Sequence, residues 1–552
     1  MSIRNFVAQI RRSDLLSAVA LASFFFLLYV PFVYRCGSGE ADCDVMVAGI
    51  YQMSFPENAQ AKGLYYFHSG QPLYNIAFAK LVAFTGMSFD TLLIMLNLLA
   101  TCSMAVAAGA LYYCSRQFDI SRYGALTGTL TFMLAPFAFE LSTYAHPQTL
   151  SIALIMVALA CWIKAVALWP LPRNVAIALG GAAVVLGTAG LLVRMDGVLL
   201  LPLLFAWPLL QWRGWKSYGV MALGLPAAIS LLALLLRKTM VHNGSGSGSD
   251  LLAGVISFAN QYSSDGFRWL PLAFGTGGTI VLIACLLGGM LNSKYRAVGA
   301  ALVALVPLLF YCSFNAAVPR RFVHLFVVAG AAVALLNQFL GTHTVSPIPV
   351  RRDKEQKRRA KKRTPITQAK ASTSLVPDAG IPRVFVILMA ILIIGNWVLW
   401  PIYGQLSRMV GDPPPSTVYS KALVQFMPAR HHEQQRFYCW EKQAMADLTS
   451  RLKSPHDLIG GWLEYGCLLA GYCRNKIPVS ISQSDIKPGR PQLTYITAAG
   501  VTHVQYGPPW DYPPGQQTPA VILLNNYKQD VTWGLKNIKA VAPPPGLTYH
   551  IW

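Results

Sequence analysis

Residues 15–33 read LLSAVALASFFFLLYVPFV and contain no charged side chain. A helix needs about 20 mainly apolar residues to cross a hydrocarbon core about 30 Å thick. The block follows Arg4, Arg11 and Arg12, as the apolar part of a signal peptide would, but it ends in aromatic residues and lacks a small-x-small cleavage site. We therefore predict a retained first membrane span.

Apolar blocks of this kind recur along the chain. The composition agrees with them, since 54% of the residues are hydrophobic and 12% are charged, whereas a soluble domain carries about a quarter charged residues. We predict an all-α polytopic membrane bundle of about 11 transmembrane helices. The further blocks lie at residues 89–113, 123–141, 148–168, 175–193, 197–211, 217–236, 269–290, 297–318, 322–340 and 383–403.

Basic residues set the expected orientation, because cytoplasmic connections are enriched in Lys and Arg. They cluster in every second connection between the apolar blocks. We assign these basic connections, and the N-terminus, to the cytoplasmic side. The formal net charge of +22 then reflects topology, and we expect no nucleic-acid partner. The basic connections hold Arg116/Arg122, Lys164/Arg173, Arg213/Lys216, Lys294/Arg296 and the run at residues 351–363, which belongs to a basic cytoplasmic loop at residues 341–382.

Two domains are predicted. Residues 1–403 form the transmembrane module, and residues 404–552 form an extracytoplasmic domain, near the start of which a Gly/Pro-rich stretch at residues 411–416 breaks the helix. Short apolar runs and helical patterns in the second part predict a small α/β soluble domain. The expected strands are residues 457–460, 477–481, 501–506 and 521–525, and the expected helices are residues 441–452 and 462–470.

The first outer loop carries an acidic motif. Residues 35–44 read RCGSGEADCD, which places Glu40, Asp42 and Asp44 just outside the first span. A carboxylate there can take a proton from an acceptor hydroxyl or bind a divalent cation such as Mg²⁺ or Mn²⁺. The alternative is a solvated loop whose acids only add solubility.

Residues 65–74, YYFHSGQPLY, follow that motif before the second span. The two stretches together resemble the membrane-embedded GT-C glycosyltransferases, closest to the family 39-like group of protein O-mannosyltransferases and lipid A aminoarabinose transferases. Those enzymes carry an Asp-Glu or Asp-x-Asp motif here and then His-Pro-Pro-Leu or Lys-Pro-Pro-Leu. The resemblance implies that Asp42 or Asp44 is catalytic, that both are candidate metal ligands, and that His68, Gln71 and Tyr74 bind substrate.

Two arginine motifs extend the resemblance. Arg194-Met-Asp196-Gly is similar to an Arg-x-Asp/Glu-Gly sequence of related enzymes, and Arg320-Arg321-Phe-Val-His324 is similar to their Pro-Arg-Tyr motif. The resemblance implies that the arginines bind a donor phosphate and that Asp196 and His324 bind substrate. The alternatives are snorkelling of Arg320 and Arg321 to lipid phosphates and a structural ion pair between Arg194 and Asp196.

His146 stands in another outer turn, beside Gln148 and near Glu140. It is either a residue of the substrate cavity or an ordinary turn residue before a helix that starts at Pro147.

Five of the ten cysteines lie in segments assigned to the outer side. Close spacing there predicts one disulfide between Cys36 and Cys43 and another between Cys467 and Cys473. Cys439 would then remain an unpaired thiol.

These features predict an inverting glycosyltransferase that moves a sugar from a polyprenyl-phosphate donor to a glycan, lipid or protein acceptor. The reaction takes place on the outer face of a bacterial inner membrane, or in the endoplasmic reticulum as the alternative location. One rival is an O-antigen ligase or polymerase that uses a lipid diphosphate donor. The other is a lipid or solute transporter, although the sequence shows no internal repeat.

Overall fold

A computed structural model describes the chain in segments. They comprise residues 13–35, 41–55, 71–117, 120–168, 173–194, 197, 200, 215–240, 270–290, 323–336 and 382–399, together with five short strands between residues 459 and 523.

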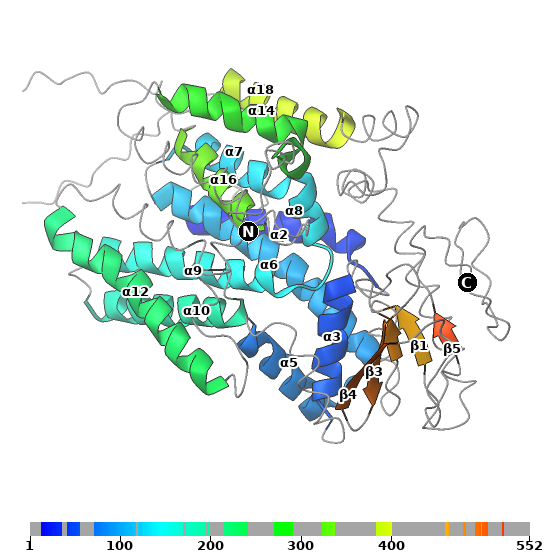
Figure 1. Ribbon diagram of the computed structural model, residues 1–552. Coiled ribbons are helices and arrows are strands. Elements are labelled where there is room, and N and C mark those ends of the chain that lie inside the picture. Colours follow the sequence, from blue (N-terminus) through cyan, green and yellow to red (C-terminus); the bar gives the residue numbers. More distant parts are fainter. Residues whose placement is uncertain are drawn as a thin grey trace, which may run out of the picture.

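Four long apolar helices belong to the bundle (Figure 1). They are α2 (Asp14–Tyr29), α6 (Phe89–Gln117), α9 (Pro147–Leu168) and α10 (Arg173–Val193). Helix α2 continues as a short 3-10 turn, η1 (Val30–Phe32). Within the described segments these four helices are long and apolar enough to cross a membrane, as the sequence predicts. The protein is therefore a helical membrane protein.

The bundle contains further helices. They are α7 (Arg122–Met133), α8 (Pro136–Leu141), α12 (Trp215–Met240), α14 (Leu270–Met290), α16 (Val323–Leu336) and α18 (Arg383–Ile393), the last followed by a π-helical turn, η9 (Ile394–Leu399). The block expected at residues 123–141 is divided, because Pro136 starts a new helix after a turn. The blocks at 197–211 and 297–318 lie almost wholly outside the described residues, so the number of spans stays a prediction.

A buried asparagine holds the kink of α14. Gly275 has φ 73° inside this helix, a left-handed conformation that glycine adopts without steric cost. Asn396 in η9 donates from Nδ2 to the carbonyl of Phe274 at 2.8 Å and accepts from the backbone N–H of Gly278 at 3.1 Å. The side chain thus satisfies backbone groups that the kink takes out of the helical ladder.

Helices α7 and α16 pack closely through two glycines. An added Cβ at Gly330 would lie 2.8 Å from the carbonyl oxygen of Gly128. Membrane helices use such small residues to bring their backbones together. Around this contact the buried part of α16 is entirely apolar.

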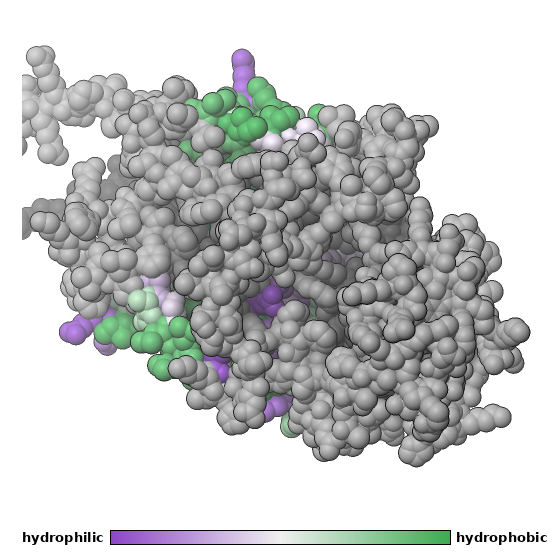
Figure 2. All heavy atoms as spheres, viewed as in Figure 1, coloured by the Kyte–Doolittle hydropathy of each residue, from purple (hydrophilic) through white to green (hydrophobic). Residues whose placement is uncertain are grey.

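The side of the bundle that faces away from its core is apolar over several helices. Figure 2 shows hydrophobic side chains gathered over α14 and α18 at the top of the view and over the α10 and α12 side below. Lipid tails are a suitable environment for such a surface, whereas water is not. Exposed residues there include Ile177, Val185, Leu231, Leu234, Ile280, Ile283, Val386 and Ile387.

Two helices that the sequence pattern did not predict lie in the first outer connection. They are α3 (Ala41–Met53) and α5 (Pro72–Thr85). Pro72 at the first position and Gly86 in the left-handed conformation after the last turn define the ends of α5. Figure 1 shows α3 and α5 at one end of the bundle.

The C-terminal part contains a five-stranded sheet in the order β4-β3-β2-β1-β5. Strand β1 runs parallel to β2 and β5, while β2–β3 and β3–β4 are antiparallel. Trp462 ends β1, so the helix expected from residue 462 cannot start there, and β3 was not predicted. The helix expected at 441–452 lies outside the described residues. The strands are β1 (Ile459–Trp462), β2 (Val479–Ile481), β3 (Gln492–Thr497), β4 (Gly500–Gln505) and β5 (Val521–Leu523).

Candidate functional site

One apolar cluster joins the segments that carry the predicted site residues. It draws side chains from α3, α5, the start of α6, the turn before α9 and the end of α10. These segments lie far apart in the sequence, and the cluster brings them to one end of the bundle. Its buried members are Met46, Val47, Ile50, Tyr74, Ala79, Val82, Phe89, Leu92, Leu93, Leu96, Ala145 and Val193.

The predicted catalytic acids lie in the first turn of α3. This helix starts at Ala41, so both Asp42 and Asp44 belong to its N-terminal turn. Their side chains are outside the described part of the structure. Exposed N–H groups and the helix dipole favour negative charge at this end of a helix. The position therefore suits carboxylates that have to remain ionised.

Gln71 and Arg194, both predicted site residues, are in contact. The Arg194 guanidinium donates from Nη1 to Gln71 Oε1 at 3.3 Å, and Gln71 Nε2 donates to Asn75 Oδ1 at 3.1 Å. Gln71 and Asn75 are 2% and 3% exposed, and Arg194 is 9% exposed. The start of α5 and the end of α10 thus share a buried polar cluster. Asn75 was not predicted, although its position four residues after Gln71 places both on one helix face.

The end of α10 is fixed from a second side. Ser151 of α9 donates from Oγ to the carbonyls of Gly190 at 2.8 Å and Arg194 at 3.3 Å. Both carbonyls also accept from backbone N–H groups, that of Gly190 from Arg194 at 3.1 Å and that of Arg194 from Gly197 at 3.0 Å. The backbone that carries the Arg194 guanidinium is therefore held in place.

Tyr74 lies in α5 beyond the polar cluster and is 2% exposed. Its ring packs at 4.7 Å, centroid to centroid, from that of Phe78. Burial raises the pKa of the Tyr74 phenol far above its usual range, and the nearby Cys43 contributes a smaller part of the shift. The physical cause is that burial disfavours the charged phenolate.

His146 lies in a tightly bonded turn. Its Nε2 is 2.8 Å from the carbonyl oxygen of Leu141, which can only accept, and its Nδ1 is 3.3 Å from Gln148 Oε1. Helix α9 starts at Pro147, as expected. His146 is 1% exposed, and its two ring nitrogens hold residues 141–148 together as a turn. A role in lining a substrate cavity stays a prediction.

Asn97 connects this turn to Tyr34, the residue just before the acidic motif of residues 35–44. Its Nδ2 donates to the carbonyl of Tyr34 at 2.8 Å, and its Oδ1 accepts from the backbone N–H of Ala145 at 2.7 Å. The backbone N–H of Tyr34 also donates to the carbonyl of Thr143 at 3.1 Å. Asn97 was not predicted as a site residue. The signal that sequence offered was a polar side chain inside a long apolar helix.

Several predicted residues fall outside the described part of the chain. His324 occupies the first turn of α16, but its side chain is not described. Cys43 is buried in α3, and its predicted disulfide partner is not described, so both disulfides stay predictions. The segments that the structure describes hold no group of three or more His, Cys, Asp or Glu residues suited to a metal. The predicted residues that lie outside the described segments are Cys36, His68, Asp196, Arg320, Arg321, Cys467 and Cys473.

The fold is GT-C-like, as the motifs predicted. The particular protein that shows this is ArnT from Cupriavidus metallidurans, whose crystal structure bound to undecaprenyl phosphate superposes with a TM-score of 0.51. Sequence identity is 14%, and the match covers 88% of this chain and 87% of ArnT. The apo form of the same protein matches at 13% identity with a TM-score of 0.46, covering 83% of this chain and 84% of that one.

No protein-family model and no curated protein sequence matches this chain.

Proposed function

We propose that the protein is an inverting glycosyltransferase that takes a sugar from a polyprenyl-phosphate donor and passes it to a glycan, lipid or protein acceptor. The reaction takes place on the outer face of the membrane, where the acidic segment lies in the predicted topology. A lipid-linked donor suits this location because nucleotide sugars are cytoplasmic. We place the protein in a bacterial inner membrane, with the C-terminal domain in the periplasm.

The observation that carries the proposal is the convergence of α3, α5, the His146 turn and the end of α10 at one end of the bundle. That end includes α3, to whose first turn Asp42 and Asp44 belong, and the buried Arg194. The fold likeness to ArnT, which has been solved with undecaprenyl phosphate, supports a polyprenyl-phosphate ligand. Neither observation identifies the sugar or the acceptor.

Each group has a role in the proposed reaction. Asp42 or Asp44 takes the proton from the acceptor hydroxyl, whose oxygen attacks the anomeric carbon while the bond to the donor phosphate breaks. Attack from the face opposite the phosphate inverts the configuration. Arg194, Arg320 and Arg321 stabilise the departing phosphate.

Further residues bind substrate in the proposed site. They are His68, Gln71, Tyr74, His146, Asp196 and His324. Gln71 is the best supported of them, because its side-chain oxygen accepts from Arg194 at 3.3 Å. A Gln71→Leu variant loses this contact and should weaken donor binding through a misplaced guanidinium.

The test compares Asp42→Asn and Asp44→Asn with Asp90→Asn. Asp90 is an acid in the first turn of α6, so it controls for removing a charge from a helix start. The catalytic substitution should lower turnover about 100-fold or more and leave binding of the polyprenyl-phosphate lipid nearly intact, because proton transfer matters mainly in the transition state. Asp90→Asn should retain full activity. Full activity in both Asp42→Asn and Asp44→Asn would refute the mechanism.

A divalent cation, Mg²⁺ or Mn²⁺, is part of the proposal, with Asp42 and Asp44 as its candidate ligands. Turnover should then fall after treatment with EDTA and return when either ion is added back. Turnover that is unchanged in EDTA would leave the carboxylates as acid–base groups alone.

Two rival functions make different predictions. An O-antigen ligase or polymerase would take a lipid diphosphate donor and tolerate loss of both aspartates while depending on the arginines. A lipid or solute transporter would show no sugar transfer at all. Mass spectrometry of the lipids that accumulate on deletion separates the proposed enzyme, which leaves a polyprenyl-phosphate sugar behind, from a ligase or polymerase, which leaves a lipid diphosphate sugar; the transfer assay separates both from a transporter.

A further inference from the structure

An apolar groove opens on the side of the bundle formed by α2, α6 and α9. Its volume is about 730 Å³. Helix α2 lines it from Leu15 to Leu27, which at about 1.5 Å per residue is about 18 Å along the helix. One leaflet of a bilayer has a hydrocarbon depth of about 15 Å, half of the full core. The groove is therefore as long as one lipid chain.

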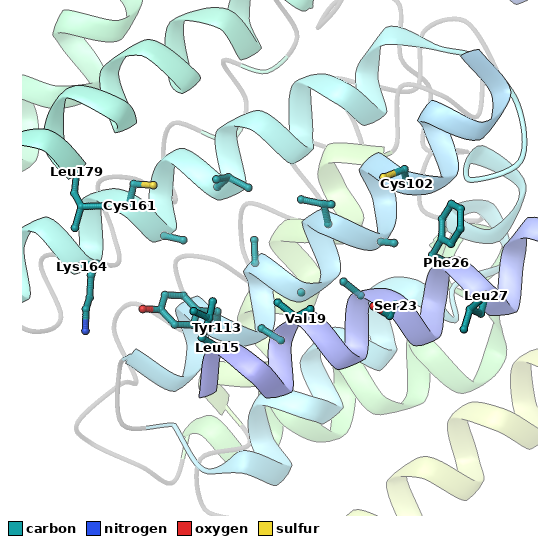
Figure 3. Close-up of a pocket in the computed structure, with 18 residues that line it drawn as sticks. Leu15, Val19, Ser23, Phe26, Leu27, Cys102, Tyr113, Cys161, Lys164 and Leu179 are labelled. Atoms are coloured by element: carbon teal, nitrogen blue, oxygen red, sulfur yellow. The ribbon is translucent and has the colours of Figure 1, made fainter. Parts of the chain in front are cut away.

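The groove has a polar end and an apolar end. Figure 3 shows the Lys164 ammonium group and the Tyr113 hydroxyl at the end near Leu15, while Phe26, Leu27 and Cys102 lie at the other end. The remaining lining is made of apolar and small residues. This is the polarity of a single lipid, with a headgroup at one end and a tail at the other.

The charge at the polar end favours an anion. The Arg116 guanidinium is already bound to Asp14, Nε to Oδ1, at 2.9 Å. Lys164 is exposed, and no carboxylate in the described segments forms an ion pair with it. A lysine at a membrane surface attracts anionic headgroups by about 1 kcal/mol.

We infer that this groove binds one anionic phospholipid, with its headgroup phosphate at Lys164 and Tyr113 and an acyl chain between α2, α6 and α9. The Lys164 end is the cytoplasmic end in the predicted topology, so the lipid belongs to the leaflet opposite the proposed transfer site. The inference does not depend on the proposed function. It gives the protein a lipid site separate from that of any sugar donor.

The first experiment measures lipid binding to the full-length protein by native mass spectrometry, with phosphatidylglycerol and phosphatidylcholine as probes. We expect one retained phosphatidylglycerol and weaker retention of phosphatidylcholine. Lys164→Gln should weaken phosphatidylglycerol binding about fivefold, which is the loss of about one lysine–headgroup attraction. The control Lys80→Gln removes an exposed lysine of α5 outside the groove and should leave binding unchanged.

Two further measurements test the position of the lipid. Val106→Trp fills the groove from an exposed position on α6 and should abolish retention of the lipid without lowering Tm. A phosphatidylglycerol with a diazirine near the end of its acyl chain should label peptides that contain Phe26 or Cys102. Equal binding of both lipids, unchanged binding in Val106→Trp, or a dimer that buries this face and excludes lipid would each overturn the inference.

Discussion

Replacing Asn97 by leucine tests whether the link between Tyr34 and the His146 turn stabilises the fold. Leucine has a similar size but cannot form hydrogen bonds. The substitution leaves the carbonyl of Tyr34 and the N–H of Ala145 without their side-chain partner. A buried backbone group that loses its partner costs about 1–3 kcal/mol, so the two together cost about 2–6 kcal/mol.

The assay is thermal unfolding of the purified protein in detergent, where we expect Tm to fall by about 3 °C or more. The matched variant is Thr101→Val, one turn along α6, which removes one hydroxyl donor shared between the carbonyls of Ser142 and, at 3.4 Å, Asn97. Asn97→Leu should be the more destabilising of the two. The reasoning is wrong if Asn97→Leu lies within about 0.5 kcal/mol of the wild type or is no worse than Thr101→Val.

Three further outcomes are expected. Gly330→Val should destabilise the protein by about 1–3 kcal/mol, because its side chain meets the backbone of Gly128 across the α7–α16 contact; an unchanged Tm would show that the helices can separate freely. An apolar diazirine probe dissolved in the bilayer should label the exposed Cys102 and spare the buried Cys114 in the native protein, and equal labelling would contradict the packing of α6. A reporter fused after Trp552 should be active only outside the cytoplasm, and activity inside would mean that the span count is wrong by an odd number.

The bilayer explains why most of the bundle could be predicted from the sequence. A membrane span has to be apolar over its whole length, so blocks such as residues 89–113 and 175–193 stand out without any knowledge of their neighbours. The start of α9 was also predictable, because proline is well suited to the first helical position.

The first outer connection was harder to predict, because its helices depend on tertiary contacts. Helix α3 has only 13 residues, too few to be stable alone in water. Its buried residues meet α5 and α6, which follow later in the chain. Neither partner is visible in the local pattern, so the segment read as a loop.

The sequence predicted individual residues of the candidate site, but it did not predict which of them are in contact. The motifs singled out Gln71 and Arg194 separately, and their contact joins positions 123 residues apart. Asn97 was missed for the same reason, since its two backbone partners lie 63 and 48 residues away. A single sequence carries no signal for such pairs.

The helical form of α3 limits how its two acids can work together. Each residue advances about 100° around a helix axis, so positions 42 and 44 are about 200° apart. The buried residues Cys43, Met46, Val47 and Ile50 occupy the stripe between them, which leaves one acidic position on each flank of the packed face. While the first turn of α3 stays helical, the proposed cation can therefore take Asp42 or Asp44 as a ligand, but not both. With the turn intact, only one flank faces a given acceptor, and the two aspartates should differ sharply in how much activity they control.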